Sequence, residues 1–279
     1  MVKDNMKIVY DVNSLRSGPI VPNPEIHKHI VFDVTMAEMC KGANPALMLS
    51  KNFSNWKGHI NALVPCKSIG ELYELERASG QAVSFSDLPR SELLEDFREF
   101  ITDIIENPNA ATTEQLQIIA QSVHEQFDAG NEVYLKNDHE IYLEALQKYD
   151  LVRKFKSASN QRDFIIDVAV KGANQYLNQY YSSKNLGKNK IKNLNGSCTF
   201  HFINHCSFTI RSLMWVRDGG FLNMKDHKVI NETADADWCS MAVYGTAVAT
   251  KDKRNIENIE FLRECIQRKS RKLKEITIL

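Results

Sequence analysis

The chain has 279 residues, enough for one large or two ordinary domains with a sizeable core. Apolar residues make up 43% and charged residues 25%, as in globular proteins, and no apolar run approaches the roughly 20 residues of a membrane span. Lysine plus arginine equals aspartate plus glutamate at 35 each, so any nucleic-acid-binding surface must be local. The N-terminus lacks a signal-peptide core and the six cysteines follow no disulfide spacing, so we expect reduced thiols in a cytoplasmic protein.

The first part of the chain predicts alternating strands and helices. A Pro-rich loop over residues 17–24 is expected to hold no regular structure. Thr35 is the expected N-cap of a helix over residues 36–41, which places Glu38 in its first turn. Three short segments rich in β-branched or apolar residues predict strands, over residues 7–12, 29–34 and 61–66.

The middle of the chain changes to helical periodicity, followed by a polar, lysine-rich loop over residues 182–195. The predicted helices cover residues 90–106, 112–129, 138–155 and 161–181. A further apolar core helix is expected over residues 200–216, and a basic terminal helix over 258–275. We therefore divide the chain into a first part of an α/β core (1–85), a helical insertion (86–195) and a second part of the core with the basic C-terminal helix (196–279).

Residues 235–252 carry the pattern around which the chain is organised. Asp235 and Asp237 are expected to open an apolar helix, where the helix dipole favours negative charge. Residues 247–250 are typical of a buried parallel strand, and Asp252 follows at the carboxyl end, where open α/β sheets place their ligands. Carboxylates that gather without an evident basic partner usually need a cation.

Two acidic residues from the other end of the chain complete this pattern. Asp11 ends the first strand and is followed by Asn13, and Glu38 lies in Ala37-Glu38-Met39. Together with Asp235 and with Thr250-Lys251-Asp252, these motifs resemble the PIN-domain family of metal-dependent nucleases. The resemblance covers roughly residues 7–78 and 200–262, and the segment between the first two strands is short and Pro-rich for the family's usual first helix.

The resemblance implies a PIN-like, three-layer α/β core with a short parallel sheet, here carrying a helical insertion. It implies an endonuclease that hydrolyses phosphodiester bonds, in RNA rather than DNA, as toxin-type and RNA-processing members do. Mg²⁺ or Mn²⁺ would be the cofactor, because both ions prefer hard oxygen ligands. The implied catalytic ligands are Asp11, Glu38, Asp235 and Asp252, with Asp237 on a second ion, Asn13 and Thr250 as hydrogen-bonding supports, and Lys251 and Arg254 as phosphate contacts.

Other functions stay open at this point. The protein could be a DNA nuclease, or a non-catalytic PIN-like module that binds a partner or inhibitor protein through the helical insertion or the terminal helix; a homo-oligomer is also compatible with the sequence. The lysines over residues 184–192 and the terminal helix are the candidates for attracting a polyanion. A zinc-stabilised binding protein is a third reading, because four zinc-ligand residue types lie close together: Cys198, His201, His205 and Cys206.

Overall fold

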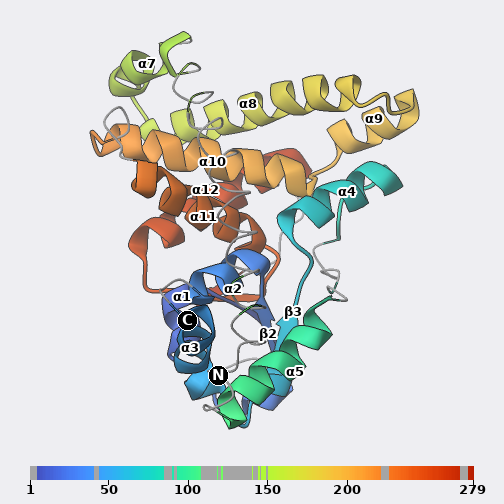
Figure 1. Cartoon of the computed structure of the whole chain (residues 1–279). Helices are drawn as coiled ribbons and strands as arrows, with labels where there is room; N and C mark the ends of the chain where they lie inside the picture. The colour runs from blue at the N-terminus through green and yellow to red at the C-terminus, as the bar shows by residue number, and fades with distance from the viewer. Residues whose placement is uncertain are drawn as a thin grey trace.

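The computed structural model describes residues 5–40, 44–84, 90, 93–107, 118, 121, 140, 144, 146–148, 150–220, 226–270 and 276–279. Within these ranges, a five-stranded, all-parallel sheet has the order β3-β2-β1-β4-β5. Its neighbouring strands β2 and β3 are labelled in Figure 1. Its strands are β1 (Lys7–Tyr10), β2 (Lys28–Val31), β3 (Leu63–Pro65), β4 (Ala247–Ala249) and β5 (Thr277–Ile278). The chain adds β2 and β3 on one side of β1 and β4 and β5 on the other, so the strand order switches between β1 and β4.

Helices fill the connections and cover the sheet. Those of the first part are α1 (Val12–Arg16), α2 (Asp33–Cys40), α3 (Pro45–Phe53), α4 (Ile69–Ser79) and α5 (Leu93–Glu106), with short 3₁₀ helices at Pro24–Ile26, Ser54–Trp56 and Ile60–Ala62. The later helices are α7 (Leu151–Ser157), α8 (Gln161–Ser183), α9 (Lys188–Gly196), α10 (Phe200–Arg217), α11 (Asp226–Ala242) and α12 (Lys253–Ser270). In the parts of the chain that the structure describes, no helix is long and apolar enough to cross a membrane.

Each face of the sheet is buried in its own apolar cluster, because alternate strand residues point to opposite sides. Val9, Ile30 and Val248 belong to the cluster shared with α8, α10, α11 and α12. Ile8 and Ala247 belong to the second cluster, shared with α2, α3 and α5. The predicted α/β class is therefore confirmed.

Two expectations for the first part were wrong. The segment between the first two strands was expected to be short for a helix, but it holds α1, which occupies the five residues ahead of the Pro-rich loop. The second helix begins before its predicted N-cap: the Met36 N–H donates to the Phe32 carbonyl at 3.0 Å, so α2 starts at Asp33. Thr35 therefore lies inside α2 and Glu38 in its second turn.

The middle of the chain agrees with the prediction in part. α5 and α8 confirm the helices predicted over 90–106 and 161–181. The helix predicted over 112–129 falls almost entirely outside the described residues. The one predicted over 138–155 is only partly described, and α7 begins after Asp150, whose φ is +51°. The lysine-rich segment predicted as a loop is wrong in part, because residues 188–196 form α9.

The basic C-terminal helix has an internal role. It corresponds to α12, which begins at Lys253 and buries Ile259, Leu262 and Ile266 in the core. Arg268 pairs with Asp163 and Asp167 of α8. These described residues therefore hold α12 on α8, and residues 271–275 lie outside the described ranges.

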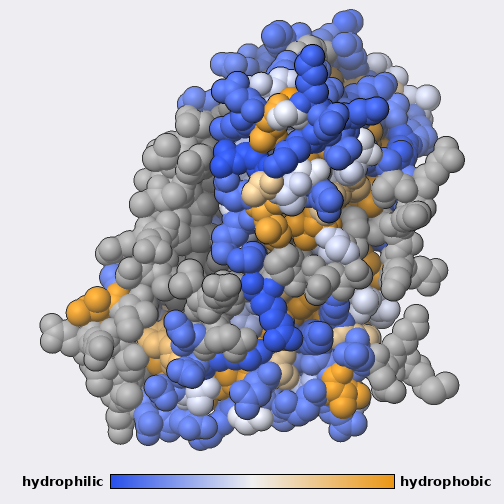
Figure 2. Space-filling view, turned by 90° about the vertical axis from the view of Figure 1, so that its right-hand side faces the viewer, coloured by the Kyte–Doolittle hydropathy of each residue, from blue (hydrophilic) through white to orange (hydrophobic). Residues whose placement is uncertain are grey.

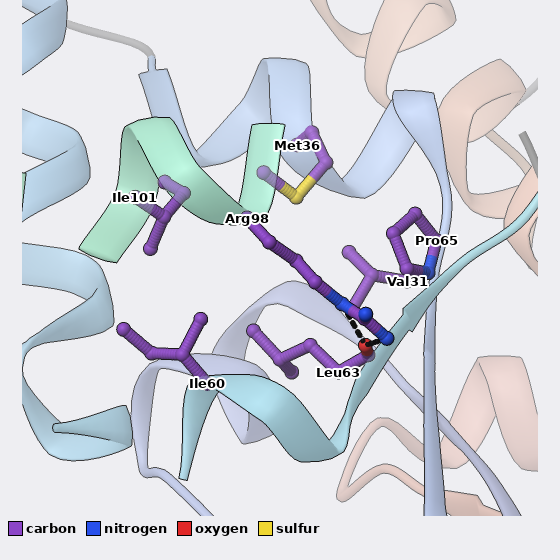
Figure 3. Close-up of a pocket in the computed structure, with 7 residues that line it drawn as sticks. All are labelled: Val31, Met36, Ile60, Leu63, Pro65, Arg98 and Ile101. Atoms are coloured by element: carbon purple, nitrogen blue, oxygen red, sulfur yellow. Dashed lines mark hydrogen bonds between the residues drawn. The ribbon is translucent and has the colours of Figure 1, made fainter. Parts of the chain in front are cut away.

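Arg98 of α5 closes the edge of the sheet at β3. Its Nε donates to the Leu63 carbonyl oxygen at 2.7 Å, and its Nη2 donates to the same oxygen (Figure 3). The apolar cavity beside it measures about 10 Å³, which leaves room for no ligand. Arg98 thus supplies donors to an edge-strand carbonyl that no further strand pairs with in the described structure.

Replacing Arg98 by methionine is expected to lower the free energy of unfolding by about 1–2 kcal/mol, because the Leu63 carbonyl loses a charged donor. Arg98→Lys should lose less, since an ammonium group can still donate. Urea denaturation of the three proteins measures the difference. Equal midpoints for wild type and Arg98→Met would show that the edge contact contributes nothing.

Candidate functional site

A pocket of about 70 Å³ brings together four of the predicted carboxylates: Asp11, Glu38, Asp235 and Asp252. Asp11 directly follows β1, and Asp252 follows β4 closely, so the pocket opens where the strand order switches. Glu38 lies on α2 and Asp235 on α11. These two helices are neighbours in the fold (Figure 1). The remaining lining residues are Val12, Asn13, Thr35, Ala234, Trp238 and Asn255. This is the position at which parallel α/β sheets bind ligands.

Asp11 and Asp252 each cap the helix that follows their strand. Asp11 Oδ1 accepts from the Ser14 N–H at 2.6 Å, at the start of α1. Asp252 Oδ1 accepts from the N–H groups of Arg254 and Asn255 at 2.7 and 3.2 Å, at the start of α12. These N–H donors hold both carboxylate side chains in fixed orientations.

Thr250 links these two aspartates. Its buried hydroxyl donates to Asp11 Oδ2 and accepts from the Asp252 N–H at 3.1 Å. Asn13, the other predicted supporting residue, lies in the lining of the pocket. Thr250 thus contacts both predicted ligands, and the supporting roles of Thr250 and Asn13 stay predictions.

Asp235 reaches the pocket from the middle of α11, not from a first turn. The prediction of its helix start was wrong because α11 begins at Asp226. Its Oδ2 accepts from Arg211 Nη2 of α10 at 2.7 Å. Burial raises the pKa of Asp235 to about 7; Arg211 opposes this rise, whereas Glu232 and other nearby carboxylates add to it.

Arg211 is a functional candidate that the sequence analysis missed. Its side chain is only 4% exposed and also pairs with Glu232, while its Nη1 donates to the Asn255 amide oxygen at 2.6 Å. It therefore ties Asp235 to Asn255 at the pocket wall. A single charged residue within the apolar run of residues 200–216 is the signal that could have identified it.

Three residues predicted to bind a metal or a phosphate do not line the pocket: Asp237, Lys251 and Arg254. Asp237 is absent from the pocket lining, and its Oδ1 accepts from the Asn204 side-chain N–H at 2.9 Å, so its predicted role on a second ion is unsupported. The Cζ atom of Arg254 lies 4.1 Å from the centroid of the Trp215 ring, and its Nη2 pairs with Asp218 at 2.7 Å. Both contacts engage the guanidinium that was predicted to bind a phosphate. Lys251 is exposed beside Asp252.

The lining chemistry fits a hard divalent cation. The donors are carboxylate, amide and hydroxyl oxygens, and the buried Thr35 hydroxyl has no hydrogen-bond partner. No group of three or more His, Cys, Asp or Glu residues in the described ranges is gathered closely enough to hold an ion directly. The volume of about 70 Å³ instead suits Mg²⁺ or Mn²⁺ that keeps several waters and meets some carboxylates through them.

The alternative zinc site is not assembled among the described residues. Cys198 and Cys206 are buried thiols whose pKa burial raises. His201 stacks on Tyr73 at 4.0 Å, and burial lowers its pKa to about 3. His205 stacks on Tyr176 at 4.6 Å, and burial lowers its pKa to about 4. These residues pack as neutral core groups.

Thr250→Val is expected to weaken Mn²⁺ binding about 10- to 100-fold, because the Asp11 carboxylate loses the hydroxyl that orients it. Thr250→Ser keeps the hydroxyl and should bind nearly as wild type does. The measurement is the Mn²⁺ concentration that gives half of the maximal rise in melting temperature. A valine variant with unchanged Mn²⁺ dependence would remove Thr250 from the site.

Comparisons of the chain with protein-family models, with curated proteins and with solved structures found no match. The function therefore has to be argued from the pocket itself and from the sequence motifs that line it.

Proposed function

We propose that this protein is a divalent-metal-dependent endonuclease that hydrolyses phosphodiester bonds, with RNA as the favoured substrate. One observation carries the proposal: Asp11, Glu38, Asp235 and Asp252 come from four separate segments and line one pocket. Their motifs are the ones that resemble the PIN-domain nucleases. The choice of RNA follows from that resemblance, and DNA is the runner-up.

The position of each pocket residue indicates its role in the proposed reaction. Asp11 and Asp252, held by helix N-termini and by Thr250, are the main cation ligands. Glu38 faces them from α2, where it can bind the ion or accept a proton from a bound water. A bound Mg²⁺ or Mn²⁺ supplies a more acidic water and positive charge for the phosphate. Lys251 is exposed at the rim for a phosphate contact.

Asp235 has a different part because of Arg211. The guanidinium fixes one carboxylate oxygen, Oδ2, and leaves Oδ1 with only a long, 3.5 Å contact to the Asn255 side-chain N–H. Oδ1 is therefore the atom of Asp235 that can turn to a hydrated cation. Arg211 also supplies one positive charge at the pocket wall. With this charge present, fewer divalent ions are needed to balance the four carboxylates.

A second candidate, a non-catalytic interaction module, has an observation of its own. Arg211 already neutralises Asp235, and the described carboxylates do not close around one point. Under this reading the four carboxylates would be capping and ion-pairing residues.

The two candidates are separated by incubating the protein with labelled single-stranded RNA and DNA in Mn²⁺, in Mg²⁺ and in EDTA. The nuclease proposal expects cleavage that EDTA abolishes and that Asp252→Asn lacks. Glu260→Gln, which removes an exposed carboxylate of α12, is the matched control and should cleave normally. Cleavage that persists in EDTA or in Asp252→Asn, or no cleavage of either polymer, would sink the proposal.

A further inference from the structure

Positive charge is concentrated in one part of a chain whose total charge is balanced. From residue 168 to residue 217 there is no Asp or Glu, while the whole chain has 35 acidic and 35 basic residues. The same stretch, which covers most of α8 and all of α9 and α10, has seven basic residues: Lys171, Lys184, Lys188, Lys190, Lys192, Arg211 and Arg217. The five lysines are exposed. Lys171 and the two arginines pair with carboxylates, so the basic surface consists of Lys184, Lys188, Lys190 and Lys192. This is the local basic surface that a polyanion requires.

α9 and the end of α4 enclose an open groove of about 380 Å³ within this region. Gly80, Gln81 and Ala82 line one side, and Lys192 and Asn193 line the other. None of the residues that line the groove is acidic. Figure 2, which looks onto the side that carries α4 and α9 in Figure 1, shows hydrophilic residues gathered over its upper part.

Aromatic rings lie beside these lysines on α8. Tyr176 and Tyr180, one helical turn apart, stack with ring centroids 6.0 Å apart and planes 20° apart. The Tyr176 side chain is 39% exposed although it is large and aromatic. Lys184, one turn further along, places its Nζ 5.2 Å from the Tyr180 ring centroid. Aromatic rings that lie next to lysines are suited to bind the bases and the phosphates of one strand.

This surface is connected to the pocket through α11. Tyr73 of α4 stacks on His201, whose ring also contacts Tyr176 and Tyr180. The Tyr73 hydroxyl donates to the Asn204 amide oxygen, and the Asn204 side chain donates to Asp237 of α11 at 2.9 Å. The neighbouring residues of α11, Asp235 and Trp238, line the carboxylate pocket. Hydrogen bonds through Asn204 of α10 therefore link the tyrosine side of the molecule to α11, which carries part of the carboxylate pocket.

We propose that Tyr176, Tyr180 and the lysines of residues 184–192 form a second binding surface, which holds a single-stranded nucleic acid outside the carboxylate pocket. Bases stack on the tyrosines, and phosphates pair with Lys184, Lys188 and Lys192. A single strand is the expected form because a duplex keeps its bases stacked inside. That the bound strand is the substrate rests on the proposed nuclease function, whereas binding itself does not.

The test is the fluorescence anisotropy of labelled 15-nucleotide single strands of RNA and DNA, and of the matching duplex, with the full chain in EDTA. We expect the Tyr176→Ala/Tyr180→Ala variant to bind single strands at least about tenfold more weakly. Tyr176→Phe/Tyr180→Phe keeps both rings and should bind as wild type does. Lys184→Ala/Lys188→Ala should weaken binding and flatten its salt dependence. Melting curves of each variant identify any loss of folding.

Binding that the alanine pair loses and the phenylalanine pair keeps supports this surface, whether or not any cleavage occurs in Mn²⁺. Equal binding by wild type and the alanine pair would overturn it, as would a preference for duplex or for polyglutamate of the same length. Metal-dependent cleavage without single-strand binding in EDTA would also overturn it and would leave the nuclease proposal standing.

Discussion

Asp11→Asn is expected to reduce metal-dependent cleavage about 10³-fold with little loss of stability. Asparagine caps a helix as well as aspartate does, so its amide oxygen still accepts the Ser14 N–H. It cannot supply the negative charge that a divalent cation needs, and an interaction of this kind contributes several kcal/mol to catalysis. Initial rates on labelled RNA in Mn²⁺, with melting curves alongside, measure both effects.

Asp237→Asn tests whether Asp237 binds the metal, as the sequence predicts, or lies outside the metal site, as its position in the structure indicates. Asp237 lies outside the pocket lining and accepts a hydrogen bond that asparagine can also accept. Cleavage close to the wild-type rate is therefore expected. A loss as large as that of Asp11→Asn would return Asp237 to the metal centre, as the resemblance to PIN domains implies. If Asp11→Asn itself cleaved at the wild-type rate, the carboxylate pocket would not be the active site.

Glu76→Ala is expected to lower the free energy of unfolding by about 3 kcal/mol or more, the largest single stability loss among these variants. Glu76 of α4 is fully buried, and its Oε1 accepts the N–H groups of Val83 at 3.0 Å and Phe200 at 2.6 Å. Its Oε2 accepts the His201 N–H at 3.3 Å. Alanine would leave the Val83 N–H and the two N–H groups at the start of α10 without a partner. Urea denaturation measures the loss.

Glu76→Gln should cost less, because its amide oxygen can keep the bonds to Val83 and Phe200. The two variants also differ from wild type in their pH dependence. Burial raises the pKa of Glu76 to about 7, although the three N–H groups oppose the rise. The folded protein thus binds this proton more tightly than the unfolded chain does, so the contribution is complete below about pH 4.5 and disappears as the pH rises through about 7. The stability advantage of wild type over Glu76→Gln should therefore shrink between pH 5 and pH 8; a constant difference would contradict the raised pKa.

Asp11 and Asp252 could be predicted as site residues because they follow strands, whereas Glu38 and Asp235 lie on helices. β1 and β4 are short apolar segments, and the aspartates that follow them must meet at one edge of a parallel sheet. The order of the strands was not needed for that inference. It emerged only in the structure, and it explains why the two aspartates are neighbours: β1 pairs directly with β4.

The wrongly predicted start of α11 and the missed Arg211 have the same physical cause. Asp235 was predicted to open its helix because the helix dipole favours negative charge there, but α11 continues back to Asp226 and packs against α10. Helix propensity and charge describe local preference, and tertiary contacts override them. Arg211 was missed for the same reason, since its partners Glu232 and Asp235 are distant in sequence.

The most direct test of the metal centre is a crystal of the protein grown with Mn²⁺, measured for anomalous scattering at the manganese edge. We expect a peak in the pocket between Asp11, Asp235 and Asp252, within reach of the Thr35 hydroxyl. A pocket without such a peak at saturating Mn²⁺, with Arg211 still bound to Asp235, would contradict it and would favour the non-catalytic reading.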